Sequence, residues 1–117
     1  MTMAVPTITD PKTLAELNDF LEEQTGIPFR LWAWSHAPAG NYGVVTEDED
    51  ATFFAGGNAE RAVQGYVDVF CRSTGFTEKA SVELALQKTR FHWRHNSAQF
   101  EPETGIVHHA FSVAWLG

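Results

Sequence analysis

Residues 91–116, with the sequence FHWRHNSAQFEPETGIVHHAFSVAWL, predict the centre of the fold. Two runs rich in aromatic and β-branched residues, 91–100 and 106–116, flank a turn at 101–105 that contains Pro and Gly. This arrangement is typical of an antiparallel hairpin. Alternation along the second run predicts one core-facing set of side chains: Val107, His109, Phe111, Val113 and Trp115.

Three further strands are expected before this hairpin. Residues 61–72 alternate between an apolar side with Val63, Val67, Val69 and Cys71 and a second side with Gln64, Tyr66, Asp68 and Phe70. Residues 29–36 and 42–46 also have strand character, and the turn residues between them predict a wide hairpin.

Two amphipathic helices complete the expected set of elements. Apolar residues recur every three to four positions over about 11–24, where Asp10 and Pro11 suit a helix start and Gly26 suits its end. A second helix is expected over about 77–90, with Thr77 as its cap.

The predicted architecture is α+β: an antiparallel sheet of about four to five strands with both helices packed on one face. We expect a single domain over residues 1–117, with residues 1–9 as a flexible lead-in.

Composition excludes several classes of protein. The formal net charge of −7 and a pI near 5.0 disfavour binding to nucleic acid or to an anionic membrane through basic residues. The lone Cys71 cannot form an intrachain disulfide. With no signal peptide or apolar span in the sequence, we expect the chain to be made and folded in the cytosol, without a membrane partner.

The histidines and Cys71 do not form a catalytic or metal-binding pattern. His92 and His95 lie in a segment that looks extended, and the adjacent His108 and His109 would point to opposite faces of a strand. Cys71 occupies an apolar strand position, which favours a buried thiol over a nucleophile. We therefore expect no enzyme activity, no metal site and no cofactor.

Exposed aromatic residues and an acidic run indicate surfaces for partners. The candidate assembly interface consists of Arg30, Trp32, Trp34, Phe53 and Phe54, because residues 29–36 are apolar on both sides of the expected strand. The acidic run, Glu47, Asp48, Glu49 and Asp50, is either a solvated loop tip or a charged loop that faces a partner or a lumen.

Four segments in order carry a family resemblance: YGVVTED at 42–48, ERAVQGYVDVFCR at 60–72, NSAQFE at 96–101 and ETGIVHH at 103–109. The sequence from about residue 26 onward resembles the tail terminator, or tail-completion, proteins of long-tailed bacteriophages, which are often labelled minor capsid proteins. The order and spacing of the four segments carry the resemblance, because each segment alone is only a strand with its turn.

The resemblance implies a structural role in the virion tail or neck after assembly in the host cytoplasm. Tail terminators are small α+β subunits that form a six-membered ring on the head-proximal end of the tail tube. The implied partners are other copies of the chain, the tail tube protein and the head-connector or head-closure protein. DNA passes through the ring without specific binding, and the acidic run at 47–50 would face the lumen or the rim.

Two alternatives remain open. One is another neck component, such as a head-closure or head–tail joining protein. The other, from a different class, is a small metal-binding domain or an enzyme that uses His92 or His109.

Overall fold

The computed structural model describes residues 8–48 and 62–116. These residues form two helices and a five-stranded sheet, and the predicted α+β class is confirmed. The elements in chain order are α1 (Leu14–Thr25), β1 (Phe29–Leu31), β2 (Tyr42–Glu47), β3 (Ala62–Cys71), α2 (Phe76–Gln87), β4 (His92–Glu101) and β5 (Ile106–Leu116).

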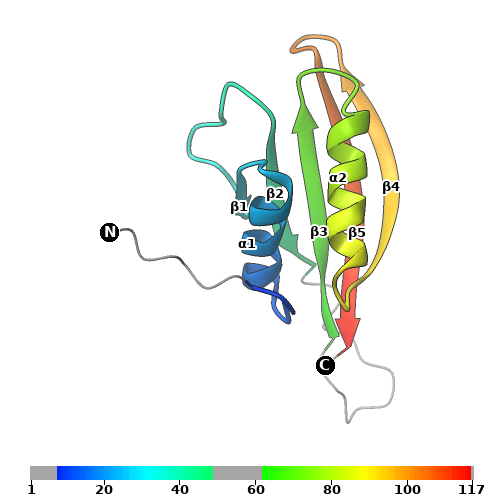
Figure 1. The fold of residues 1–117 in the computed structure, drawn as a ribbon. Helices are drawn as coiled ribbons and strands as arrows, with labels where there is room; N and C mark the ends of the chain where they lie inside the picture. The colour runs from blue at the N-terminus through cyan, green and yellow to red at the C-terminus, as the bar shows by residue number, and fades with distance from the viewer. Residues whose placement is uncertain (1–7, 49–61, 117) are drawn as a thin grey trace.

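The strands lie side by side in the order β1-β2-β3-β5-β4 (Figure 1). The pairs β2–β3, β3–β5 and β4–β5 are antiparallel, whereas β1 and β2 are parallel. The sheet is therefore mixed, and the prediction of a wholly antiparallel sheet is wrong at β1.

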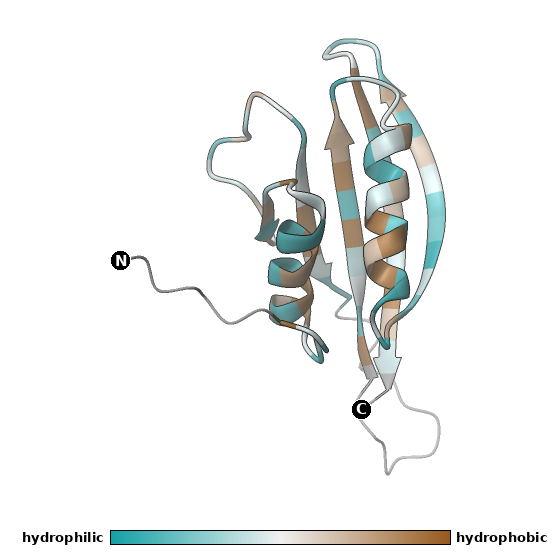
Figure 2. Ribbon diagram, viewed as in Figure 1, coloured by the Kyte–Doolittle hydropathy of each residue, from teal (hydrophilic) through white to brown (hydrophobic). Residues whose placement is uncertain are grey.

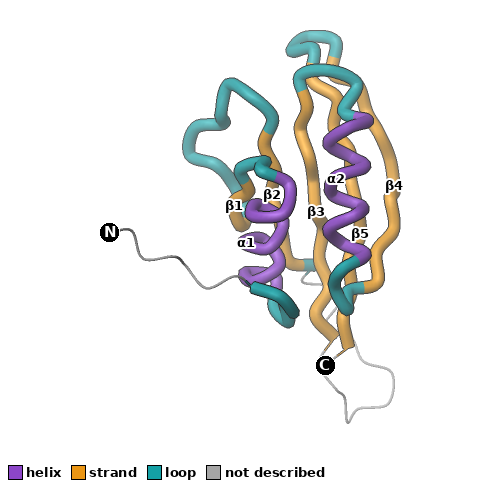
Figure 3. The backbone as a smooth tube through the Cα atoms, in the orientation of Figure 1, coloured by secondary structure: helices purple, strands orange, loops and turns teal. Residues whose placement is uncertain are grey.

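Residues 29–36 differ from the sequence prediction in length and direction. The strand ends at Leu31 because Trp32 adopts a positive φ of 70°. Residues 32–41 then carry the chain back along the sheet as a long loop before β2 begins (Figure 3), so β1 and β2 run in the same direction. Gly43 N–H donates to the Pro28 carbonyl at 2.8 Å in this parallel pair. The predicted wide hairpin is thus wrong.

Both helices cover one face of the sheet, and no helix formed by residues 8–48 or 62–116 covers the other face (Figure 1). Their apolar residues meet the inward side chains of β2, β3 and β5, including Val45, Val67 and Phe111, which are fully buried. Apolar and polar residues alternate along β3, and the outer side of α1 is hydrophilic (Figure 2). The core therefore lies between the helices and this one face.

The C-terminal hairpin agrees with the prediction. Strands β4 and β5 pair from His92 opposite Ala114 to Glu101 opposite Ile106, and Gly105 in the turn has a φ of 72°. Along β5 the predicted core face is confirmed, since its members are buried or half-buried: Val107, His109, Phe111, Val113 and Trp115. A bulge between His95 and Ser97 shifts the register of β4 by one residue.

The residues at the helix ends show which of the predicted capping positions are used. Gly26, with a φ of 73°, ends α1 as expected, but Thr13 caps its start by accepting from Glu16 N–H. Helix α2 begins at Phe76 after Gly75, whose φ is 74°, and no side chain caps it. The predicted starts at Asp10–Pro11 and at Thr77 are therefore wrong by one to three residues.

Neither helix in the described ranges has the length and apolarity needed to cross a bilayer.

Candidate assembly surface

The uncovered face of the sheet, hereafter the open face, is formed by the side chains that alternate with the core. Along β3 these are Gln64, Tyr66, Asp68 and Phe70, as the sequence predicts. The open-face positions of β5 carry small side chains, which form a shallow strip between larger side chains on β3 and β4: Ala110, Ser112 and Ala114. This side of the molecule is ridged and partly apolar.

A row of stacked rings crosses the open face at one end of the strands. Tyr42 stacks on Phe70 with ring centroids 4.8 Å apart, and Phe70 stacks on His108 at 4.4 Å. Both pairs are close to parallel, with interplanar angles of 14°. Trp34 meets the edge of the row at 6.2 Å from Tyr42. We call Trp34, Tyr42, Phe70 and His108 the aromatic row.

Polar contacts fix both ends of the aromatic row. The His108 ring lies with Nε2 2.7 Å from Asp68 Oδ1, and the Trp34 indole N–H donates to the Gly43 carbonyl at 3.0 Å. The Arg30 guanidinium lies over the Trp34 ring, 5.1 Å from its centroid. Because these contacts already hold the rings in place, a partner that docked on them would cost little side-chain entropy.

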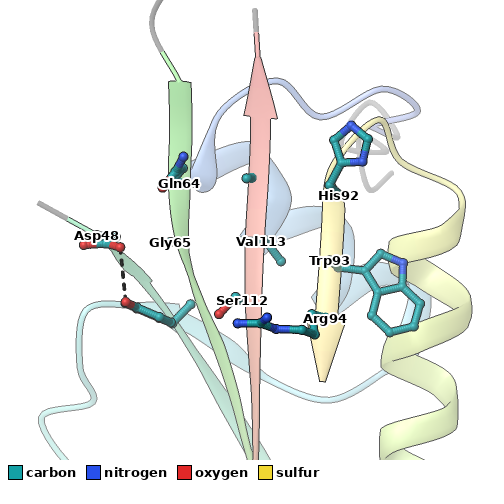
Figure 4. A pocket seen from close by; sticks show the side chains of 10 residues that line it. Asp48, Gln64, Gly65, His92, Trp93, Arg94, Ser112 and Val113 are labelled. Atoms are coloured by element: carbon teal, nitrogen blue, oxygen red, sulfur yellow. Dashed lines mark hydrogen bonds between the residues drawn. The ribbon is translucent and has the colours of Figure 1, made fainter. Parts of the chain in front are cut away.

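Two hollows indent the open face. One, of about 350 Å³, lies beside the aromatic row and is lined by Trp32, Trp34, Tyr42, Phe70 and His108 among others. The second, of about 310 Å³, lies toward the opposite end of the strands (Figure 4). There Arg94 extends across toward Ser112, and Asp48 accepts a hydrogen bond from the Tyr66 hydroxyl at 3.1 Å.

Three of the residues predicted for an assembly interface come together in the structure. Arg30, Trp32 and Trp34 are brought close by the turn after β1, not by strand alternation as expected. Trp32 is 54% exposed and lines the same hollow as Trp34. Phe53 and Phe54, the other two, lie outside the described residues.

The acidic run is only partly described. Glu47 is the exposed last residue of β2, and Asp48 faces the hollow of Figure 4. Glu49 and Asp50 lie outside the described residues. The expectation that this run faces a lumen or rim therefore stays a prediction.

Sequence reasoning did not assign Tyr42, Phe70 and His108 to a site. Their signal was present in the alternation, because Phe70 falls on the side of β3 away from Val69 and Cys71. The missing information was the pairing of strands: Tyr42 lies opposite Phe70, and Phe70 lies opposite His108. These positions are far apart in the sequence.

The histidines divide between the two faces, as the alternation predicts. His108 lies on the open face, whereas His109 is buried among the core residues. His109 Nε2 is 3.1 Å from the Thr74 carbonyl and must donate to it, so its Nδ1 accepts from His95 Nε2, 3.2 Å away. Within residues 8–48 and 62–116, no three His, Cys, Asp or Glu side chains gather as metal ligands would.

Cys71 lies in the core near this histidine pair. Burial, together with the nearby Glu78, raises the pKa of the Cys71 thiol from 9.0 to about 11. The thiol is therefore protonated at neutral pH, whereas a nucleophilic cysteine needs a lowered pKa and access to solvent. This environment is that of a packing residue.

Comparisons with known proteins add no family to this geometry. No protein-family model matches the chain, and no curated protein matches it significantly. The residues themselves provide an open face whose rings, hollows and charged groups suit contact with another protein.

Proposed function

We propose that this chain is a tail terminator of a long-tailed bacteriophage. In this role it is a structural, non-enzymatic subunit that forms a six-membered ring on the head-proximal end of the tail tube. The observation that carries the proposal is the open face with its aromatic row, stacked at 4.8 and 4.4 Å. In the described part of the chain, helices cover one face of the sheet and ordered rings line the other, which supports a subunit that is completed by assembly.

The proposed mechanism is capping. Head-to-tail contacts between copies close a ring when the rotation between neighbours closes. The ring masks the growing end of the tube and so stops its polymerisation. Its other side offers a new surface to the head-connector or head-closure protein, which places the chain in the neck of the virion.

The acidic character of the chain supports a conduit that does not bind DNA. A lumen lined with carboxylates repels phosphates and avoids the affinity that basic grooves gain by counterion release. We propose Glu47 and Asp48, with Glu49 and Asp50 beyond the described residues, as part of that lining or of the rim.

A tube-assembly assay tests this function. Tail tube protein would be polymerised with and without the purified chain, and tube lengths would be measured in electron micrographs. We expect shorter tubes with a ring at one end when the chain is present. Unchanged tube lengths and bare ends would overturn the proposal.

The same assay distinguishes a tail terminator from the nearest alternative, another neck component. A head-closure or head–tail joining protein would leave tube lengths unchanged and bind tubes only after a terminator had capped them. Direct capping of bare tubes by the chain would therefore favour the terminator over other neck components.

A further inference from the structure

A hollow of about 740 Å³ opens between α1 and the β1 end of the sheet, where the two elements lie side by side (Figure 1). One wall is formed by polar side chains of α1: Asn18, Asp19 and Glu22. The other wall is formed by residues of β1 and of the turn that follows it, including Arg30 and Trp34. Trp34 also belongs to the aromatic row, so the hollow borders the candidate assembly surface.

Asn18 has a buried oxygen without a partner in this wall. The residue is 6% exposed, and its Nδ2 donates at 3.3 Å both to the Phe29 carbonyl and to Asp19 Oδ1. Because both of these partners are acceptors, the amide cannot be turned over. Asn18 Oδ1 accepts no hydrogen bond from any described residue. A buried acceptor left unsatisfied costs stability, so its presence beside a hollow indicates a donor that comes from another molecule.

Two exposed carboxylates beside Asn18 each have one oxygen engaged. Asp19 Oδ1 accepts from Asn18, and Glu22 Oε1 accepts from the Phe29 N–H at 3.0 Å. The second oxygen of each carboxylate makes no hydrogen bond or ion pair with any described residue. Residues four apart on a helix lie on the same side of it, so α1 offers three neighbouring acceptors to the hollow.

The charges around the hollow favour a cation. Among the described residues of its lining, Arg30 is the basic one, and its guanidinium lies over the Trp34 ring, 5.1 Å from the centroid. Arg30 forms no ion pair with Asp19 or Glu22, and two carboxylates against one guanidinium leave the lining negative. The last turn of α1 also carries no basic residue. A cation beside Glu22 would therefore be stabilised by the helix dipole as well.

We propose that this hollow binds a primary ammonium group at the end of an aliphatic chain, the chemistry of a lysine side chain or of a free alkyl amine. Such a group has three N–H donors and no acceptor, which matches the acceptors of Asn18, Asp19 and Glu22. The aliphatic chain would lie along the apolar part of the lining, which includes Pro28 and Leu31. The site is separate from the proposed tail-terminator function and does not depend on it.

A metal ion fits this set of oxygens less well. Calcium takes about six to eight oxygen ligands. The side chains of the described lining offer two carboxylates and one amide oxygen, and the Phe29 carbonyl already accepts from Asn18. An ammonium group needs only as many acceptors as α1 provides.

Titration of the isotope-labelled chain with butylammonium, followed by NMR, tests the site. We expect saturable shifts of the Asn18 side-chain amide and of the Trp34 indole N–H. Butanol, which lacks the charge, and tetramethylammonium, which lacks N–H donors, should leave both signals in place. Lysine blocked at both ends of its backbone should reproduce the shifts if lysine side chains are the source, whereas shifts with butylammonium alone would assign the site to a free amine.

Variants of the two carboxylates provide the second arm. Asp19→Asn with Glu22→Gln keeps the acceptors for Asn18 and for the Phe29 N–H, but should weaken butylammonium binding at least about fivefold. The matched control, Glu16→Gln with Glu23→Gln, removes two charges from the same helix outside the lining and should bind like the wild type. Circular dichroism would establish that each variant is folded.

Several outcomes would overturn the inference. Equal binding of tetramethylammonium would show that charge alone suffices, and tighter binding of calcium than of butylammonium would indicate a metal site. Shifts that leave the Asn18 amide unmoved would place the amine elsewhere. Binding by Arg30→Met but not by the wild type would show that the chain's own Arg30 fills the hollow. The proposed function would stand in each case, because tube capping is measured without amines.

Discussion

Gly75 occupies a position where both backbone conformation and space demand glycine. Its φ is 74°, and a Cβ there would lie 2.8 Å from His109 Nε2 and 2.9 Å from Cys71 Sγ. Gly105 has a similar φ of 72°, but a Cβ there would meet nothing within 4 Å. A comparison of substitutions at the two glycines therefore distinguishes the cost of backbone strain from the cost of crowding.

We expect Gly75→Ala to lower the free energy of unfolding by more than Gly105→Ala does. Positive φ costs an alanine about 1–2 kcal/mol at either site, and crowding in the core adds about 1–3 kcal/mol at Gly75. Urea unfolding of both variants would measure the difference. Equal losses would show that the chain after β3 does not pack against His109 as described.

His95 should make stability depend on pH. Burial, with smaller effects of Lys79 and His109, lowers the pKa of His95 below 6.5, although Glu83 acts in the opposite direction. The unfolded chain therefore binds a proton at a higher pH than the folded chain does. The protein should lose stability as the pH falls through about 6.5 toward the lowered pKa of folded His95.

The measurement is the urea midpoint of the wild type and of His95→Gln across this pH range. The variant should show a shallower fall in midpoint than the wild type. His36→Gln, at an exposed position, serves as the control and should fall like the wild type. If His95→Gln left the change of the urea midpoint with pH unaltered, the lowered pKa of His95 would be ruled out as a source of the pH dependence of stability.

The hairpin of β4 and β5 is the element whose side-chain placement can be tested most simply. Phe111 is fully buried under the helices, whereas Trp115 is half-buried near the end of β5. Phe111→Ala should cost about 3–5 kcal/mol of stability, as large aromatic truncations in cores do, and Trp115→Ala should cost less. Denaturant unfolding of both variants would measure this order.

A shift of β5 by one residue would turn every side chain to the other face. The control is Ser112→Ala, on the open face between these two positions, which should change stability little. A small loss for Phe111→Ala together with a large loss for Ser112→Ala would contradict the register.

The elements that the sequence predicts well are those with a long, regular alternation. Residues 106–116 alternate over the whole strand, so the buried face could be assigned from the sequence alone. Residues 29–36 look similar, but only Phe29–Leu31 form a strand. The end of β1 depends on the positive φ of Trp32, and its parallel pairing with β2 depends on the path of residues 32–41. Alternation of apolar and polar residues indicates neither feature.

The same limit applies to the candidate site. Arg30, Trp32 and Trp34 were accessible to sequence reasoning because they are close in the chain. The aromatic row was not, since Tyr42, Phe70 and His108 meet only through strand order. A surface built across strands can be recognised only once the neighbours of each strand are known.

At the scale of the whole molecule, the open face should matter for assembly more than for folding. We expect Phe70→Ser to leave a folded monomer that associates at least tenfold more weakly, because an aromatic anchor at an interface typically contributes more than about 1.4 kcal/mol. Phe100→Ser is the matched control, since Phe100 is 63% exposed and pairs with Val107 on the helix-covered side. Sedimentation equilibrium would compare the two, and equal weakening would argue against a special role of the open face.

Native mass spectrometry of the wild-type chain over a concentration series would show whether the chain forms the proposed ring. We expect a closed species of six chains, joined head to tail, that grows with concentration at the expense of the monomer. A monomer at every concentration, or an open-ended series of masses with no closed species, would contradict it.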